Sequence, residues 1–521
     1  MIQLTLLEKF DAFNRVLGCP DTFLTRIVRE ALALARFEPR ILAHLQHDIE
    51  RVCRAAKKGR LMDEIFLEEQ LPKFPELEDI LEPSDFDSVK TWTFRLEDGG
   101  RPRAVDAELL LVLMVINGVF SLTSRQGYER LIESEVFNVL LGAGPVGVPA
   151  RSTVGKYLEI PSERTHKLIH KALYRKVEEE ALDDFLDLTV DSTGIEANSS
   201  WPTESGLIFG FLKRIHGLLH KQARYTGVAY ESKLVKRWLE QLEKLHKQIN
   251  LLPVKPGCRA RRRKLYRSLL RVADKARKKL RELLDRRYER ITGCCILPSH
   301  RLRVDRIMEQ VQDSFDEAGK AMASARRRVI LRESVSATGK AYSLADPDAY
   351  MIQKGNRDPL VGYKPQIGRS AEGFISCFEV QRGNPADSTR LQPMVVEHER
   401  QTGIIPSTVS TDDGYSSGPN LTALQVMGVD LVSFSGSKGK TVLGEETWQL
   451  PEYEKTRKDR SAVESTIFTF KHKCSMRRFC RHGLDGVNKD LSEAVLAHNL
   501  WRIAYVRRQK HDEDPPLGNV A

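Results

Sequence analysis

The 521-residue sequence predicts a mixed α/β protein, in which a sheet core is preceded by a helical region and interrupted by a long basic helical insertion. First, apolar strand patterns alternate with helical ones in the C-terminal part of the chain, which is typical of a mixed sheet. Second, the strand pattern disappears over residues 207–339, where apolar residues follow helical spacing. Third, residues 1–185 are also helical in pattern. We therefore assign residues 186–206 and 340–505 to the sheet core and residues 506–521 to a polar C-terminal tail.

The N-terminal region shows a buried helix and then an amphipathic helix in ELLLVLMVINGVFSLTSRQGYERLIESEVFNVLLG, joined near Thr123–Gly127. A turn then leads into STVGKYLEI, where Ser152 or Thr153 is suited to cap a further short helix. Short helices with Arg151 and Lys156 near one end fit a helix-turn-helix, and they fit an all-helical packing domain equally well. We expect this region to serve in DNA binding or dimerisation.

The charge balance predicts a polyanionic partner. The chain has 82 Lys and Arg residues against 71 Asp and Glu residues, a net charge of +11. Between Arg259 and Arg290 alone, 15 Lys and Arg residues stand against four Asp and Glu residues, which equals the excess of the whole chain. A solvated spacer helix has the same composition, but this concentration favours a helix that follows DNA phosphates. The expected contact residues in this segment are Arg261, Arg262, Arg263, Lys264, Lys278 and Lys279.

Several other classes of site and location are excluded by the sequence. The eight cysteines form no C-x-x-C pair, so neither a zinc ribbon nor a disulfide framework is expected. The pairs His166/His170 and His216/His220 lack the second half of a metal site, so we interpret them as structural. The most apolar run, LLLVLMVI, is far shorter than the about twenty residues of a membrane span. The N-terminus does not have the pattern of a signal peptide, and we expect a cytoplasmic protein.

The sheet core begins with a strand in LDLTVDSTGIEAN and resumes after the insertion with a hairpin in VGYKPQIG and GFISCFEVQRG. A helix follows in STRLQPMVVEHERQTG, with Asp387 or Ser388 as the expected N-cap and Gly403 as the stop. The next strand is IIPSTVSTDDGY, and SGPNLTALQVMGVDLVSF then reads as a helix and a strand. Two helices close the chain, in DRSAVESTIFTFKHK and NKDLSEAVLAHNLWRIAYVRRQK.

Two aspartates end apolar strands in this pattern, Asp191 in the first strand and Asp412 in VSTDDGYSS. If the two strands are neighbours, both carboxylates lie in the crevice at the carboxyl edge of the sheet. Two such carboxylates repel each other unless a cation lies between them, and hard oxygen ligands suit Mg²⁺. Asp413 is the alternative ligand, because adjacent strand residues point to opposite faces and only one of the pair can serve an undistorted site.

A third acid is expected on a helix beyond the second of these strands. In RSAVESTIFTFK, Arg460, Glu464 and Lys471 fall within roughly 40° of one another around a helix axis. One helix face thus presents an acid suited to a metal ion, flanked by cations suited to phosphates. An ordinary exposed helix with one Arg–Glu pair at i,i+4 has the same pattern, so the residues alone leave both interpretations open.

The motifs taken together resemble those of the DDE transposases of bacterial insertion sequences, in particular the ISNCY-like group. The resemblance extends over most of residues 100–505 and depends on four segments, DSTGIEANSSWPTESGL, GYKPQIG with EGFISCFEVQRGNPADS, STDDGYSS and RSAVESTIFTFK. The family signature Y-x2-R-x3-E-x6-K is matched by Arg460, Glu464 and Lys471, whereas Arg457 stands at the tyrosine position. The D-x-G-Y motif of the family assigns the second acid to Asp412 rather than Asp413.

The resemblance implies an RNase H-like catalytic core in which Asp191, Asp412 and Glu464 bind two Mg²⁺ ions, with Mn²⁺ able to substitute. It implies cleavage and joining of double-stranded DNA at the terminal inverted repeats of a mobile element and in target DNA. It also implies a homodimer in the synaptic complex and a nucleoid-associated bacterial protein. Arg457, Arg460 and Lys471 are then expected to contact DNA. The alternatives are a metal-dependent nuclease of the same fold, such as a junction resolvase, and a catalytically silent domesticated DNA-binding protein.

Overall fold

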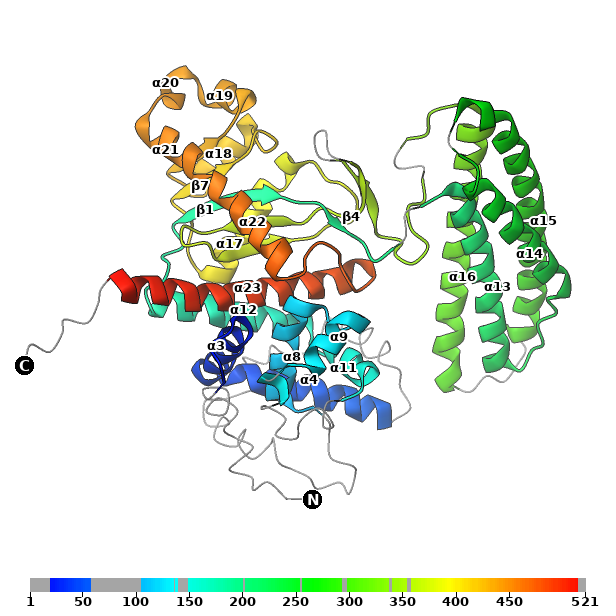
Figure 1. The fold of residues 1–521 in the computed structure, drawn as a ribbon, viewed down its shortest axis with the longest axis horizontal. Helices are drawn as coiled ribbons and strands as arrows, with labels where there is room; N and C mark the ends of the chain where they lie inside the picture. The colour runs from blue at the N-terminus through cyan, green and yellow to red at the C-terminus, as the bar shows by residue number, and fades with distance from the viewer. Residues whose placement is uncertain are drawn as a thin grey trace, which may run out of the picture. The chain divides into compact units, whose positions relative to one another are not determined.

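The computed structural model describes residues 19–57, 105–134, 136–138, 149–199, 202–253, 255–292, 298–336, 340–353 and 358–513, and the architecture is that of these residues. They form two compact units, one with the described residues up to Asn198 and from Ile352 onward, and one with Ser199–Met351 (Figure 1). The N-terminal helices and the sheet core therefore belong to one unit, and the helices of the insertion belong to the other.

A five-stranded mixed sheet is the centre of the first unit. Its strands are β1 (Asp187–Ser192), β5 (Gln366–Arg369), β6 (Ile375–Glu379), β7 (Thr408–Thr411) and β8 (Leu431–Phe434), and their order is β6-β5-β1-β7-β8. The β6-β5 and β5-β1 pairs are antiparallel, whereas the β1-β7 and β7-β8 pairs are parallel. The sheet confirms the predicted mixed α/β class with an RNase H-like core, and β1 is its central strand.

Helices cover the two faces of this sheet, and the alternation of side chains along β1 decides which residues meet which helix. Leu188 and Val190 pack with apolar side chains of α17 (Leu391–Thr402) and α18 (Gly418–Val426). The opposite face is covered by α22 (Ser461–Lys473), because Arg369 Nε of β5 donates a hydrogen bond to Thr466 Oγ1 at 3.0 Å. Arg369 is paired with Thr189 of β1, so Thr189 and Asp191 point to the face of α22.

Two sequence expectations near the sheet are corrected by the structure. VGYKPQIG is not one strand, because the chain breaks at Lys364–Pro365 into β4 (Leu360–Tyr363) and β5. The hairpin is formed by β5 and β6, while β4 pairs in a second sheet of order β2-β4-β3, with β2 (Ile195–Glu196) and β3 (Tyr350–Ile352). The sequence analysis also missed three short helices before α22, namely α19 (Ser437–Leu443), α20 (Glu445–Trp448) and α21 (Pro451–Asp459).

The N-terminal helices form one cluster with the C-terminal helix α23 (Gly483–Glu513). They are α3 (Phe23–Phe37), α4 (Arg40–Lys57), α8 (Ala107–Phe120), α9 (Arg125–Ile132), α11 (Arg151–Leu158) and α12 (Glu163–Glu179). Ser152 and Thr153 lie inside α11 and do not cap it, because the N-cap position is Ala150. Helix α23 continues past residue 506, where a polar tail was expected to begin, and residues 514–521 lie outside the described part of the chain.

A buried arginine fixes these helices to one another. Arg481, only 5% exposed, forms ion pairs with Asp490 at 2.6 Å and Glu493 at 2.9 Å in α23, and with Glu159 at 2.7 Å after α11. Glu493 also accepts a hydrogen bond from Asn117 of α8. A buried charge is tolerated only when it is paired and hydrogen-bonded in this way, so this network restricts how α8, α11 and α23 can pack.

The second unit is a bundle of four helices, which confirms the helical insertion. They are α13 (Glu204–Thr226), α14 (Lys233–Asn250), α15 (Arg259–Thr292) and α16 (Pro298–Ala325). Their apolar faces share one core, in which Leu212, Leu242, Leu280 and Phe315 are buried. None of the described helices in either unit is long and apolar enough to cross a membrane.

Several histidines are buried and hydrogen-bonded rather than arranged as metal ligands. His166 Nδ1 and His170 Nε2 share the Ser492 hydroxyl, each at 2.9 Å. Burial lowers the pKa of His170, His398 and His498 to about 4. These three side chains are therefore neutral in the folded protein at neutral pH.

We expect the free energy of unfolding to fall as the pH decreases from about 6.5 to 4. Over this window the unfolded chain binds protons that the folded histidines exclude, at a cost of at most about 3 kcal/mol for each histidine. Urea unfolding at a series of pH values measures the slope. His398→Gln should flatten it, whereas His482→Gln, at an exposed position, should leave it unchanged. Equal slopes for the wild type and His398→Gln would contradict the assignment.

Candidate active site

The parallel pairing of β1 with β7 brings two of the predicted acids together. The register pairs Val190 with Thr411, so the next residues along the two strands, Asp191 and Asp412, lie side by side. Neighbouring strands are about 4.8 Å apart, which places two carboxylates at the same edge of the sheet. Asp191 is 6% exposed, and Asp412 is partly buried. The structure thus brings these two acids into one place at the carboxyl ends of adjacent parallel strands.

The neighbouring acid Asp413 has a different partner. Its carboxylate accepts hydrogen bonds from the backbone N–H groups of Gly439 at 2.8 Å and Lys438 at 3.3 Å, at the start of α19. A carboxylate in this position satisfies N–H groups that have no partner within the helix. Asp412 Oδ1 instead accepts from the N–H of Gly414 at 2.9 Å, within its own turn. The two aspartates of the STDDGY segment therefore have different structural roles. Asp413 accepts hydrogen bonds at the start of α19, and Asp412 accepts one within its own turn.

A third carboxylate near this pair, Asp387, was expected only as a helix cap. The side chain of Asp387 does not cap α17, since it forms an ion pair with Lys364 at 2.8 Å and accepts from Gln366 Nε2 at 3.0 Å. A side chain added at Gly414 would meet Asp412 Oδ1 at 3.0 Å and Asp387 Oδ2 at 3.4 Å, so both carboxylates approach this glycine. No local sequence pattern pointed to Asp387, because its proximity to Asp412 depends on the tertiary fold.

Tyr415 connects these acids to the sheet. It is fully buried, and its hydroxyl donates a hydrogen bond to Gln366 Oε1. Burial, together with the negative charges of Asp387, Asp191 and Asp412, raises the pKa of Tyr415 well above its usual value. The phenol is therefore a neutral hydrogen-bond donor, and it fixes the turn that follows Asp412.

The predicted third acid, Glu464, lies on α22 but is not gathered with the aspartates. Its side chain is 64% exposed and forms an i,i+4 ion pair with Arg460 at 3.1 Å. Lys471, further along the same helix, donates a hydrogen bond from Nζ to Gly194 O at 2.7 Å, just beyond β1. Within the described residues, no three Asp, Glu, His or Cys side chains lie close enough together to hold a metal ion. Helix α22 is thus placed against β1, with Glu464 pointing outward.

The segment that contains these elements matches a known domain family. Residues 334–500 match the family model described as a transposase DDE domain. This segment is a transposase DDE domain. The match includes Asp412 and Glu464 and begins after the four helices of the insertion, so Asp191 precedes it. No curated protein and no solved structure matches the chain. The DDE domain indicates a transposase-type nuclease that acts on DNA, and this class of enzyme generally uses divalent metal ions.

Arg457, which stands at the tyrosine position of the signature, has an internal role in the DDE domain. Its guanidinium lies over the ring of Trp448, 3.9 Å from the centroid, and donates to Trp448 O at 2.8 Å. This contact is a cation–π interaction with an added hydrogen bond, and it holds α20 against α21. Arg457 is thus engaged within the protein, as are Arg460 and Lys471, and a DNA contact stays a prediction for all three.

The expected DNA-contact residues of the insertion divide into two groups. Arg262 donates to Leu252 O at 2.6 Å and Lys279 pairs with Glu282 at 3.1 Å, so both make contacts within the bundle, and Arg263 is half-buried. Arg261, Lys264 and Lys278 are exposed. Between Lys264 and Lys278, three further cations that were not predicted are also exposed, namely Arg267, Arg271 and Lys275.

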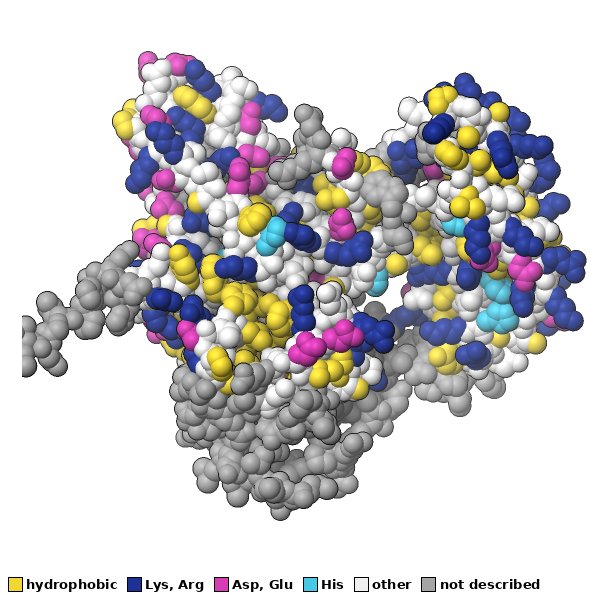
Figure 2. Space-filling model, viewed as in Figure 1, with side chains coloured by type: hydrophobic (Ala, Val, Ile, Leu, Met, Phe, Trp, Pro, Cys, Tyr) yellow, Lys and Arg dark blue, Asp and Glu magenta, His cyan; other side chains and the backbone are white. Residues whose placement is uncertain are grey.

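We call Lys264, Arg267, Arg271, Lys275 and Lys278 the basic stripe of α15. Their spacing places them on one side of the helix, opposite the buried Leu269, Ala273, Ala276 and Leu280. Among the described residues, none of the five forms an ion pair with a carboxylate. Figure 2 shows how densely Lys and Arg side chains gather on the surface of this unit. The stripe is thus a solvated row of cations rather than a set of internal salt bridges.

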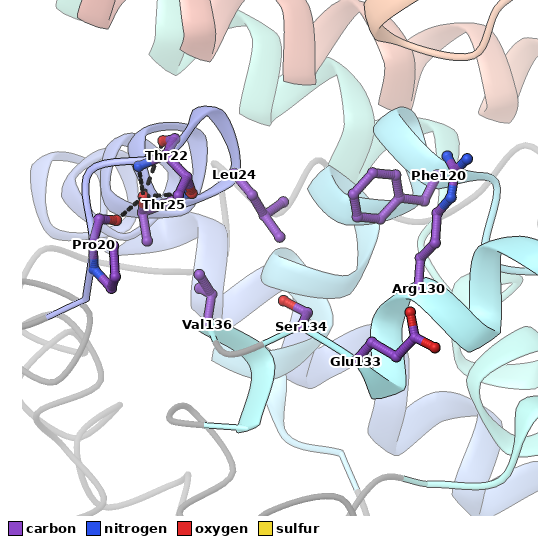
Figure 3. A pocket seen from close by; sticks show the side chains of 9 residues that line it. All are labelled: Pro20, Thr22, Leu24, Thr25, Phe120, Arg130, Glu133, Ser134 and Val136. Atoms are coloured by element: carbon purple, nitrogen blue, oxygen red, sulfur yellow. Dashed lines mark hydrogen bonds between the residues drawn. The ribbon is translucent and has the colours of Figure 1, made fainter.

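A cavity of about 290 Å³ lies apart from the acids. It is lined by residues of α3, α8, α9 and adjoining segments (Figure 3). Leu24, Phe120 and Val136 give it apolar walls, and the guanidinium carbon of Arg130 lies 5.7 Å from the centre of the Phe120 ring. No strand of the five-stranded sheet contributes to its lining, so this cavity is not part of the candidate active site.

We expect Asp413→Ala to lower the free energy of unfolding by about 0.5–2 kcal/mol, because two N–H groups at the start of α19 lose their acceptor. Asp430→Ala is the matched control, since Asp430 is an exposed aspartate close by in the same domain, and it should change stability by less than about 0.5 kcal/mol. Urea unfolding measures both values. If Asp413→Ala were as stable as the control, Asp413 would not have this capping role.

Proposed function

We propose that the protein is a DNA transposase of the bacterial insertion-sequence type, with catalytic residues Asp191, Asp412 and Glu464. It cleaves DNA at the terminal inverted repeats of its mobile element and joins the freed 3′-hydroxyl group to target DNA. The observation that supports this best is the adjacency of Asp191 and Asp412 across β1 and β7, next to the helix that carries Glu464. Asp412 and Glu464 also lie within the residues that match a DDE domain.

The donor set fits divalent metal ions. Two carboxylates directly opposite each other on neighbouring strands repel, and a cation between them removes this repulsion. Two Mg²⁺ ions, or Mn²⁺ in their place, would neutralise charge on the phosphate and on the attacking and leaving oxygens. Asp191 and Asp412 would hold them in positions set by the strand register. Glu464 would complete the set by a movement of its exposed side chain or of α22, because it is not near the pair in the structure described.

The other side chains of the site would position the reacting groups. Lys364 neutralises the charge of Asp387. Tyr415 fixes the turn after Asp412, so the carboxylate of Asp412 would be oriented before substrate binds. Arg460 would move from Glu464 to a phosphate when the carboxylate turns inward, and Lys471 would contact the phosphate next to β1. These two cations would attract the negatively charged phosphate, which the carboxylates alone would repel.

The basic stripe of α15 would bind the DNA backbone along the insertion. A helix rises 1.5 Å per residue, so the row from Lys264 to Lys278 spans about 21 Å. That length covers several phosphates of a duplex, and each contact releases counterions. Since both ends of an element must be held for joining, we propose a homodimer in the synaptic complex.

We expect Asp191→Asn, Asp412→Asn and Glu464→Gln each to reduce Mg²⁺-dependent strand cleavage by at least about 10²–10³-fold. DNA binding should be retained, because the phosphate contacts lie elsewhere. The assay uses DNA with the terminal repeats of the element and Mg²⁺, and it scores nicked and joined products separately. Asp413→Asn is the matched control and should cleave normally.

Each outcome of this assay has a clear meaning. Cleavage that survives one of the three substitutions would remove that residue from the site. Nicked products without joined products would favour a nuclease or resolvase, and the absence of both in the wild type would favour a silent DNA-binding protein.

We expect replacement of Arg267, Arg271, Lys275 and Lys278 by Gln to weaken duplex binding and to flatten its dependence on salt. The slope of log affinity against log salt should fall by about 0.9 for each phosphate that the variant no longer neutralises. The matched control replaces four exposed cations of α14, Lys233, Lys236, Arg237 and Lys244, with the same change in net charge. Fluorescence anisotropy at several salt concentrations compares them. Equal losses of affinity in the two variants would show a general charge effect rather than a binding stripe.

A further inference from the structure

An exposed aromatic side chain on α22 is not used by the site described above. Phe468 is 62% exposed, more than any other phenylalanine in the described part of the chain. Its ring stacks on His472, with centroids 4.0 Å apart and an angle of 28° between the planes. Arg477 Nη2 lies 2.8 Å and 3.1 Å from the two nitrogens of the His472 ring. We call these three flat side chains the aromatic platform.

The aromatic platform is next to Glu464, one of the three proposed catalytic residues. Glu464, Phe468 and His472 follow one another at steps of four residues, so they form one exposed row along α22, and the half-buried N-cap Arg460 lies one step before them. Phe468 is one turn beyond Glu464, about 6 Å along the helix axis. The same helix contacts the end of β1 through Lys471, which bonds to Gly194 O. Figure 2 shows hydrophobic, histidine and Lys or Arg side chains together on the surface of this helix.

The charge around the aromatic platform points to a nucleic acid rather than to a protein. No acidic residue occurs between Glu464 and Asp485, and the same stretch contains Lys471, Arg477 and Arg478 as well as His472. Lys473 points elsewhere, with its Nζ 4.0 Å from the centre of the Trp501 ring. A nearby acid from another segment, Glu196, pairs with Arg478 at 3.3 Å. An exposed ring among cations is the arrangement that stacks a nucleobase while the neighbouring charges hold its phosphates.

We propose that the aromatic platform stacks an unpaired base of the DNA strand that enters the active site. Every base in a duplex is covered by its neighbours, so the ring can stack only on a base that has left the helix or lies in a single-stranded end. This inference rests on the proposed function for the identity of the ligand, and it adds a binding subsite one helical turn from Glu464. The subsite selects unpaired ends without reading their sequence.

The test measures DNA binding by the full chain in EDTA, so that no cleavage is involved. The two probes are a fully paired duplex and the same duplex with a three-nucleotide single-stranded end that carries 2-aminopurine. The wild type should prefer the probe with the unpaired end and should change its fluorescence. Phe468→Ala should lose this preference by about 5- to 150-fold and bind the paired duplex as before.

Matched variants separate stacking from a general apolar contact. Phe468→Trp should keep or strengthen the preference, whereas Phe468→Leu, which is apolar but cannot stack, should lose it. Thermal unfolding checks that each variant is folded, which we expect because Phe468 is exposed. A preference unchanged in Phe468→Ala, or retained in Phe468→Leu, would overturn the proposal.

Two further outcomes can be distinguished from these. If Phe468→Ala abolished concentration-dependent self-association in sedimentation while DNA binding stayed the same, the platform would be a contact between two copies and the proposal would be wrong. If Asp191→Asn cleaved DNA normally and also kept the preference for unpaired ends, the proposed catalytic role of Asp191 would be wrong, and the proposed stacking subsite would still be supported.

Discussion

The parallel pairing of β1 with β7 is the interaction on which the candidate site depends. These strands are more than 200 residues apart in the sequence, and the whole insertion lies between them. Because β1 is the central strand, its register is fixed on one side by β5 and on the other by β7. A shift by one residue would turn Asp191 to the face that Leu188 and Val190 now occupy, and it would turn those two apolar residues to the opposite face. The apolar residues that build the core therefore also determine where the carboxylate points.

The buried Arg481 network accounts for the packing of the N-terminal helices and the sheet into one unit. Asp490 and Glu493 lie on α23, which also contacts β6, because Asn499 and the backbone of Ile375 exchange two hydrogen bonds. Arg481 then links α23 to the end of α11. A chain cut near residue 185 would remove the ion pair of Arg481 with Glu159 and the hydrogen bond from Asn117 to the buried Glu493. The predicted boundary there is thus a change in secondary structure rather than a division between independently packed parts.

The sequence predicted most of the elements of the sheet because their signals are local. The strand at Asp191, the helix stop at Gly403 and the helix with Glu464 each follow from periodicity or glycine conformation, and Gly403 has φ of 81°. Features that depend on tertiary packing were missed. The ion pair between Lys364 and Asp387 joins the β4–β5 break to the turn before α17. Nor does periodicity predict that α22 leaves Glu464 exposed, because that depends on how the helix rests on the sheet.

The distribution of charge bears on how an acidic site could bind DNA, which is itself negatively charged. In the proposed function a phosphate would bind beside Asp191 and Asp412, with Asp387 close to Asp412, and these carboxylates would repel the phosphate unless cations intervene. Lys364 neutralises one of them, and metal ions would neutralise the other two. The binding energy for DNA must then come from elsewhere, and the insertion is suited to supply it. It has its own apolar core, so the sheet can close without it and its surface is free to carry the basic stripe. In the proposed function, free energy from phosphate contacts along α15 would help to bring the scissile phosphate to the acids.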